Sequence, residues 1–318
     1  MEKLCDLSLC TACMACLNIC PTKAVFFQMD ELGCLMPQID EKKCIDCRLC
    51  LNTCPQLKSS EKHSVIKAYA LYTKDISDRK LCSSGGVATT LGRWFLRAGG
   101  AVCGTAFESN GKPVMKLAEN EQELEEFRGS KYVYCEPGRI YLQVKNILEH
   151  EKPVLFVGLP CQVDACKKIV GQSAMLMTIG LICHGTPPYA YLKNHLYKQV
   201  KESAPFFSFR GKYNYMLCAY NSNKKVIFKK RQAEDAYFSA YMNGVITREN
   251  CFQCQYAESK RVEDITIGDF WGLNSNALGG YKGRVSVALC NTEKGIDFFE
   301  KAKGNFFWEE RDPQEAIA

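Results

Sequence analysis

Two short cysteine runs are the residues of this sequence with the clearest chemistry. The first, CTACMACLNICP, spans residues 10–21, and the second, CIDCRLCLNTCP, spans residues 44–55. Each has the spacing C-x2-C-x2-C-x3-C-P, in which three thiolates bind one four-iron cluster and the fourth ligates the other cluster. The spacing therefore predicts two [4Fe–4S] clusters. The predicted ligands are Cys10, Cys13, Cys16 and Cys54 for one cluster and Cys44, Cys47, Cys50 and Cys20 for the other.

Zinc is the alternative metal at these runs, because C-x2-C pairs also bind zinc. A doubled four-cysteine run that ends in Cys-Pro is not a zinc-ribbon spacing, so the iron–sulfur interpretation is favoured. Between the runs, AVFFQMD and DELGCLMPQID predict a strand, a turn and a return strand. Residues 1–58 thus form an internal repeat and resemble the bacterial two-cluster ferredoxin domain, an α+β fold.

The composition indicates a folded chain that keeps its thiols reduced. The sequence has 318 residues and 20 cysteines, and it is 47% hydrophobic, which is enough to pack a core. No signal-peptide pattern opens the chain, and its longest apolar runs are too short to cross a bilayer. We therefore expect a cytoplasmic protein without a membrane span, in which cysteines bind metal rather than form disulfides.

The net charge of +6 lies in the larger C-terminal part of the chain. Residues 1–58 carry six basic and seven acidic side chains, so the excess of basic residues falls after them. An excess of this kind suits an anionic cofactor, an anionic substrate or an acidic carrier protein. No basic run is interleaved with aromatic residues, so we expect no nucleic-acid partner.

Residues 59–318 alternate between helix and strand patterns. CSSGGVATTLGRWFLRAGG predicts a Ser/Gly loop and then a helix from about Gly86 to Arg97, while PVLFVGLP and AMLMTIGLIC predict buried strands. This alternation predicts an α/β domain with a largely parallel sheet and with loops at its carboxyl edge. The Ser/Gly loop would favour a phosphate, although neither a P-loop nor a dinucleotide fingerprint is present.

Seven segments of this part resemble the coenzyme F420 hydrogenase/dehydrogenase β-subunit family, in its bacterial form with a fused ferredoxin. They are CSSGGVATTL, FRGSKYVYCEPG, PVLFVGLPCQVDAC, LICHGTPP, NCFQCQYA, DITIGDFWG and GRVSVALCNTEKG, in the family's order over nearly all of 60–295. The resemblance implies FAD and iron–sulfur chemistry in the α/β domain. Family members commonly continue beyond EERDPQEAIA, where this chain ends, which indicates a shortened form or a chain cut short there, with part of the partner surface missing.

The resemblance implies a flavin site built from three loops. Each serine taken alone is explained as well by a turn or a helix cap. His184, which follows Cys183, is a candidate proton donor beside the flavin, and a structural histidine that donates to a backbone carbonyl is the alternative. The implied FAD contacts are Ser83, Ser84, Gly85, Gly86, Thr89, Ser130, Lys131, Tyr132, Gly268, Asp269 and Phe270.

Four cysteines of the matching segments are the implied ligands of a third [4Fe–4S] cluster, namely Cys161, Cys183, Cys251 and Cys254. Two alternatives stay open. Cys161, expected at a helix N-terminus, would also suit a redox-active thiol, and Cys251 with Cys254 would suit a zinc knuckle. The other cysteines are predicted to be buried bystanders, and they are Cys5, Cys34, Cys82, Cys103, Cys135, Cys166, Cys218 and Cys290.

The resemblance implies an oxidoreductase that passes electrons between a one-electron carrier and a two-electron partner through FAD. The partners would be an electron-carrier protein or redox subunit and a small molecule, F420 or another acceptor. Arg210, Lys212 and Arg248, expected in loops, are candidates to meet an anionic partner. The alternatives are a non-enzymatic electron-transfer subunit of a larger dehydrogenase or hydrogenase, and a reductase of a polysaccharide-biosynthesis intermediate.

Overall fold

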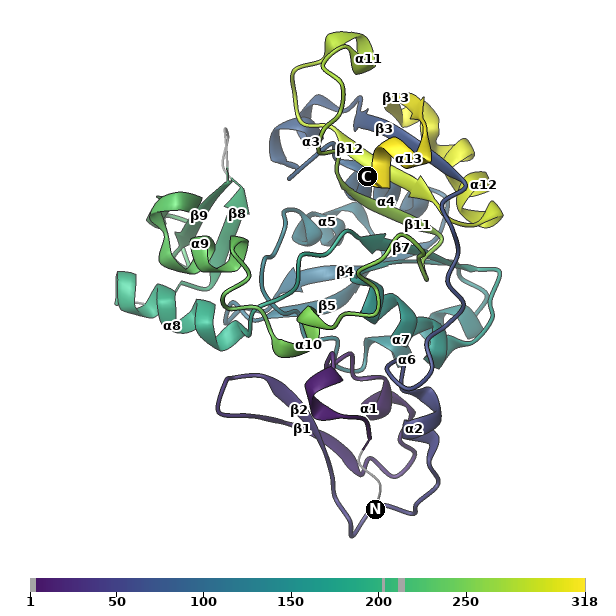
Figure 1. Cartoon of the computed structure of the whole chain (residues 1–318), viewed down its shortest axis with the longest axis vertical. Coiled ribbons are helices and arrows are strands. Elements are labelled where there is room, and N and C mark those ends of the chain that lie inside the picture. Colours follow the sequence, from purple (N-terminus) through teal and green to yellow (C-terminus); the bar gives the residue numbers. More distant parts are fainter. Residues whose placement is uncertain (1–3, 202–203, 211–214, 318) are drawn as a thin grey trace.

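One large sheet organises the computed structural model, which describes residues 4–201, 204–210 and 215–317 (Figure 1). Its strand order is β13-β3-β12-β11-β7-β6-β4-β5. The strands are β3 (Lys67–Thr73), β4 (Ala101–Phe107), β5 (Pro113–Ala118), β6 (Val154–Gly158), β7 (Leu176–Leu181), β11 (Ile265–Asp269), β12 (Ser286–Cys290) and β13 (Phe306–Arg311).

The centre of this sheet is parallel and its edges are antiparallel. Strands β4, β6, β7 and β11 are parallel neighbours, as the alternation of strands and helices predicted. At one edge β5 returns antiparallel to β4, because the turn between them is too short for a crossover helix. At the other edge β12, β3 and β13 pair antiparallel in succession. The chain is thus an α/β protein with a mixed sheet.

Helices cover both faces of the sheet and bury its side chains. On one face, α6 (Ile140–Glu149) and α7 (Pro160–Val170) pack with Phe156 of β6 in one core cluster. On the other face, α4 (Val87–Arg97) and α12 (Glu293–Ala302) pack with Leu155 of the same strand. Adjacent strand residues point to opposite faces, so both faces of β6 are buried. The predicted helix from about Gly86 to Arg97 is confirmed as α4.

The N-terminal segment, residues 4–58, lies beneath the sheet, next to α6 and α7 (Figure 1). It contains α1 (Ala15–Ile19), the antiparallel pair β1 (Val25–Met29) and β2 (Leu35–Ile39), and α2 (Leu49–Thr53). The predicted strand, turn and return strand are confirmed. Helices α1 and α2 contact each other and α7. The polar connector after this segment is also docked, since the Ser60 hydroxyl donates to Asp164 at 2.6 Å.

A smaller sheet of order β10-β9-β8 projects from the side of the large sheet with α8 and α9 (Figure 1). Its elements are α8 (Tyr189–Val200), β8 (Phe206–Arg210), β9 (Tyr215–Tyr220), β10 (Val226–Arg231) and α9 (Ala236–Met242). The remaining helices are α3 (Ile76–Leu81), α5 (Glu121–Leu124), α10 (Glu249–Phe252), α11 (Ala277–Gly280) and α13 (Pro313–Ile317), with 3-10 turns that include η1 (Leu7–Leu9) and η2 (Glu125–Phe127). Among the described residues, no helix is both long and apolar enough to cross a membrane.

Candidate functional site

The first cysteine set gathers between α1 and α2 and consists of Cys10, Cys13, Cys16 and Cys54. Burial raises the pKa of the Cys16 thiol well above its ordinary value, and the charges of Cys13, Cys10 and Cys54 raise it further. These thiols therefore lie within electrostatic reach of one another. The backbone N–H of Ala12 also donates to the Cys10 sulfur at 3.4 Å. Hydrogen bonds to sulfur are one of the means by which proteins tune iron–sulfur clusters.

The second cysteine set lines a cavity at the far end of the N-terminal segment and consists of Cys20, Cys44, Cys47 and Cys50. The cavity has a volume of about 510 Å³, including space open to solvent, and Ile39 and Ile45 also line it. The N–H of Ala24 donates to the Cys20 sulfur at 3.2 Å. Cys47 is exposed. This end of the segment is therefore accessible to another molecule.

The backbone repeats the same turn in the two cysteine runs. Ala12 and Met14 have φ angles of 51° and 62°, and Asp46 and Arg48 have φ angles of 50° and 58°. A non-glycine residue in a sparsely populated conformation costs on the order of 1–3 kcal/mol and persists only where its surroundings enforce it. The internal repeat predicted from cysteine spacing therefore extends to the backbone.

The third cysteine set combines residues from α7, from the end of β7 and from α10, which lies about 70 residues further along the chain. Cys161 opens α7, Cys183 follows β7, Cys251 lies in α10 and Cys254 follows it. Burial raises the pKa of Cys161 well above its ordinary value, and the charges of Cys183 and Cys13 raise it further. Both a redox-active thiol and a metal ligand act as the thiolate, so this pKa does not distinguish the two roles. Cys183 in turn lies within electrostatic reach of Cys251 and Cys254.

Within the described part of the chain, no three His, Cys, Asp or Glu side chains converge closely enough to hold a single metal ion. A zinc ion binds all its ligands at one atom, whereas a cubane spreads its four thiolates over different irons. The choice of clusters over zinc at the two N-terminal runs therefore stays a prediction from their spacing.

A large cavity lies above the third set, at the carboxyl ends of β6, β7 and β11 and the start of α4. Its volume is about 1520 Å³, including space open to solvent. Cys183 of the third set and His184 line it. Nine of the residues implied for FAD also line it, namely Ser83, Ser84, Gly86, Thr89, Ser130, Lys131, Tyr132, Gly268 and Asp269.

Gly85 and Phe270, which were also implied for FAD, do not line this cavity. Phe270 packs with Ala68 and Val287 behind the sheet. Gly85 packs against β3 and β12, where an added Cβ would lie 2.4 Å from the Leu71 carbonyl oxygen. Gly85 therefore supports the loop from behind, and Phe270 faces away from it.

Two arginines from distant segments hold the loop that opens α4. The Arg79 Nη1 donates to the Ser84 carbonyl at 2.8 Å, and the Arg284 Nη1 donates to the Ser83 carbonyl at 3.3 Å. The loop is also joined to the next one, since the N–H of Ser130 donates to the Ser83 hydroxyl at 2.7 Å. Sequence patterns gave no signal for Arg79 or Arg284, because only the fold brings them to this loop.

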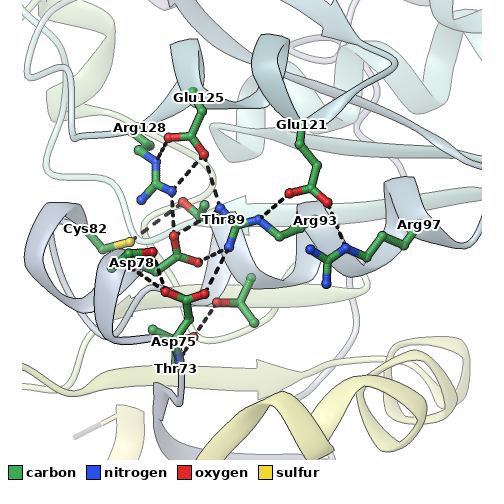
Figure 2. A network of polar contacts seen from close by, with 12 residues as sticks. Thr73, Asp75, Asp78, Cys82, Thr89, Arg93, Arg97, Glu121, Glu125 and Arg128 are labelled. Atoms are coloured by element: carbon green, nitrogen blue, oxygen red, sulfur yellow. Dashed lines mark hydrogen bonds and ion pairs between the residues drawn. The ribbon is translucent and has the colours of Figure 1, made fainter.

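A buried ionic network holds the two loops in place (Figure 2). Asp78 is fully buried and accepts from Arg93 and from Arg128, each at 2.5 Å. Arg93 continues the network to Glu121 and Glu125, which ties α3 and α4 to α5 and η2. A buried carboxylate is stable only when it is paired in this way. The network therefore fixes the segments from which Ser83 and Ser130 project.

Of the three basic residues expected in loops, two lie in the described part of the chain. Arg210 lies on β8 rather than in a loop, and its Nη2 donates at 2.7 Å both to Asp269 and to the Tyr132 hydroxyl. Arg248 lies in the loop before α10, as expected, and is buried, with 6% exposure. Lys212 lies outside the described residues. The guanidinium of Arg210 therefore positions two cavity residues.

His184 and Thr186 follow Cys183 along the cavity wall. The His184 Nε2 lies 3.2 Å from the Met242 carbonyl, which matches the structural alternative for this histidine. The Thr186 side chain is buried, and its Oγ1 has no hydrogen-bond partner among the described residues. An unpaired buried hydroxyl on a cavity wall fits a bound polar group.

Three side chains of the larger part anchor the first cysteine run. The Arg248 Nη2 donates to the Thr11 carbonyl at 3.1 Å, the Tyr134 hydroxyl donates to the Ala12 carbonyl at 2.7 Å, and the Tyr141 hydroxyl donates to the Cys13 carbonyl at 2.9 Å. Tyr134 and Tyr141 are buried. Three successive carbonyls are thus held from outside the segment. The anchoring role of the two tyrosines was not predicted from the sequence, because an isolated tyrosine carries no spacing signal.

We expect Tyr141→Phe to speed the loss of iron from the first set about fivefold. The variant removes one buried hydrogen bond, worth about 1 kcal/mol, and leaves the Cys13 carbonyl unpaired. The measurement is the decay of visible absorbance in the presence of a chelator. Tyr197→Phe, at a residue 66% exposed on α8, is the control. Equal decay in both variants would contradict an anchoring role for Tyr141.

The cysteines predicted to be bystanders are all buried, as expected. Cys5 is more than a distant bystander, because it packs directly against Cys10 and Cys54 of the first set. Its position between two predicted ligands could not be foreseen, since it precedes the repeated spacing.

Two family models match this chain, one over its larger part and one over its N-terminal segment. The model of the C-terminal part of the coenzyme F420 hydrogenase/dehydrogenase beta subunit matches residues 151–316, more than half of the chain. The chain belongs to this family. The model of the 4Fe-4S dicluster domain matches residues 9–57, which contain the first and second cysteine sets. This member of the F420 hydrogenase/dehydrogenase β-subunit family is therefore an iron–sulfur protein with a redox role.

A solved structure shares the fold of this family member. It is a chain of the F420-reducing [NiFe] hydrogenase complex from Methanosarcina barkeri, studied by xenon derivatization, and is 18% identical. The match covers 78% of this chain and 82% of that chain, with a TM-score of 0.54. No curated protein matches the chain by sequence. The family match contains the third cysteine set, Gly268 and Asp269, whereas the Ser83 and Ser130 loops precede it.

Proposed function

We propose that the chain is a flavin- and iron–sulfur-dependent oxidoreductase that passes electrons between a one-electron carrier and a two-electron partner. One observation carries this proposal. The three cysteine sets are linked from an exposed thiol to the cavity. Cys47 of the second set is exposed, and Cys20 of the same set caps α1, which carries Cys16 of the first set. Cys13 of the first set lies within electrostatic reach of Cys161, and Cys183 lines the cavity. A carrier protein would meet the second set, and a small molecule would enter the cavity.

The twelve cysteines of the three sets would hold three [4Fe–4S] clusters, which supply one-electron transfer. Residues 1–58 would form a two-cluster ferredoxin domain, and residues 59–318 would carry the third cluster and the flavin. The repeated left-handed turns at Ala12 and Asp46 support the two N-terminal sites. The charges of Cys183 and Cys251 act on Cys161, so these cysteines of the third set lie near one another, which supports a shared site.

The cavity residues fit a flavin nucleotide. The buried Thr186 hydroxyl lacks a partner among the described residues and lies on the cavity wall. Arg79 and Arg284 occupy the carbonyls of the Ser83–Ser84 loop, and the N-terminus of α4 favours an anion. FAD, when bound, supplies the change between one-electron and two-electron transfer. With its Nε2 at the Met242 carbonyl, His184 on the cavity wall would have only its Nδ1 free to exchange a proton with a bound molecule.

Lys131 predicts a pH dependence of flavin binding. Burial lowers the pKa of its ammonium from 10.5 to about 8, so its charge is present below pH 8 and is lost above it. If this charge attracts the anionic flavin nucleotide, the dissociation constant should rise roughly tenfold from pH 7 to pH 9. Lys131→Gln should flatten this dependence, while Lys198→Gln on α8 should keep it. The same slope in Lys131→Gln would assign the dependence to another group.

The second candidate is a non-enzymatic electron-transfer subunit, and the structural neighbour favours it, because that chain comes from a hydrogenase complex. The F420 named for that complex and in the family description is our first candidate for the two-electron partner. Turnover of F420 or another small acceptor by the isolated chain would support the enzyme. Activity only together with a copurified catalytic subunit would support the subunit role.

The proposed function is tested first by metal and flavin content. The measurement is iron, sulfide, zinc and flavin on anaerobically purified protein, with visible spectra before and after dithionite. We expect about twelve irons and one FAD per chain. About eight irons without flavin would remove the basis for the enzyme and leave a protein that only conducts electrons.

A further inference from the structure

Arg248 is a buried cation between two of the cysteine sets. It caps the N-terminus of α10, three residues before Cys251, and its backbone N–H donates to the Thr186 carbonyl at 3.3 Å. Its side chain reaches in the opposite direction, to the Thr11 carbonyl beside Cys10. One residue thus touches the loop of the first set and the helix of the third.

Only neutral groups contact the Arg248 guanidinium in the described part of the chain. Its Nη2 donates to the Thr11 carbonyl, its carbon lies 4.4 Å from the centre of the Tyr134 ring, and its Nε has no hydrogen-bond partner. No carboxylate among the described residues forms an ion pair with it. A buried charge without a counter-ion costs several kcal/mol of desolvation. Such an arrangement persists where a negative group offsets the cost.

Cysteines of the two sets lie within electrostatic reach of Arg248 and would be thiolates as cluster ligands. The charge of Arg248 acts on Cys10 of the first set and on Cys161 and Cys183 of the third. Reduction of a four-iron cluster adds one negative charge, and net charge around a cluster is one determinant of its potential. A nearby cation in a medium of low dielectric constant stabilises that added charge.

We propose that Arg248 raises the reduction potentials of both the first and the third cluster. The inference rests on the proposed third cluster. Arg248 is a positioning and tuning residue, because it contacts the loop of one set and the helix of the other rather than a substrate. Its role is electrostatic, so it requires the charge at position 248 and not merely the volume of the side chain.

The test is a redox titration of the anaerobic full-length protein, followed by electron paramagnetic resonance, for the wild type, R248Q and R248K. In R248Q we expect the first and third centres to shift to lower potential by at least a tenfold change in their oxidised-to-reduced ratio, which is about 59 mV. R248K should stay close to the wild type. R139Q is the matched control, since Arg139 donates to the Leu17 carbonyl of the same segment.

Each outcome decides between the alternatives. Unchanged potentials in R248Q with full iron content would overturn the proposal. If R248Q loses iron, the redox titration is repeated with R248M, which also lacks the charge. If R248K retains iron and both neutral variants lose it, the result supports a role for the positive charge at position 248. If R248K loses iron as well, Arg248 has a structural role and the proposal is overturned. Eight irons in the wild type would instead refute the third cluster of the proposed function. The shift of the first cluster's potential in R248Q would then still test the effect of Arg248.

Discussion

Cys254→Ala is expected to remove about four irons from each chain and to leave the other eight in place. Cys254 belongs to the third set, and Cys183 lies within electrostatic reach of it. The first and second sets are built from α1, α2 and the turns beside them, so they do not depend on this residue. Loss of one thiolate exposes an iron and destabilises its cluster. The measurement is iron per chain together with the visible spectrum.

Cys218→Ala provides the matched control for this experiment. Cys218 is buried on β9, away from the three sets, and its substitution should leave iron content unchanged. Full iron content in Cys254→Ala would remove Cys254 from the ligands and reopen the bystander interpretation. Loss of one zinc in place of four irons would establish the zinc knuckle.

Gly85→Ala is expected to weaken flavin binding at least tenfold without changing the iron content. A Cβ at this position would lie 2.4 Å from the Leu71 carbonyl oxygen and 2.8 Å from the Ser286 backbone nitrogen. These are backbone atoms of β3 and β12, so the loop has to move instead. Overpacking of this kind costs about 1–3 kcal/mol, and the displaced loop carries Ser83 and Ser84.

The measurement for Gly85→Ala is flavin per chain and the dissociation constant of FAD for deflavinated protein. Gly304→Ala is the control, because an added Cβ there meets no atom within 4 Å. Wild-type flavin affinity in Gly85→Ala would mean that the Ser83–Ser84 loop does not hold the flavin. Iron lost along with flavin would instead indicate a general folding defect.

The sequence predicted those features that depend on local spacing. The cysteine runs determine two turns of the same shape, and the apolar runs at Val154 and Leu176 became central parallel strands. The antiparallel edge was not predicted, because the pairing of β13 with β3 joins segments more than 200 residues apart and has no local signature.

The contacts that position the candidate site were the least predictable. Arg79, Arg284 and Tyr141 carry no motif, and their roles arise only when the fold brings them to a backbone carbonyl. The sequence also gave no sign of which of Gly85 and Gly86 lines the cavity. Neighbouring glycines look alike in sequence, and both pack against β3, yet only Gly86 lines the cavity.

The anchoring of residues 11–13 affects which positions are free to vary among homologous chains. Arg248, Tyr134 and Tyr141 all bind main-chain oxygens, which every amino acid supplies. These contacts therefore do not restrict the side chains of Thr11 and Ala12, which are restricted instead by burial and, at Ala12, by the left-handed turn. Selection would act instead on the three distant donors, so their hydroxyls and guanidinium should persist wherever the two parts remain fused.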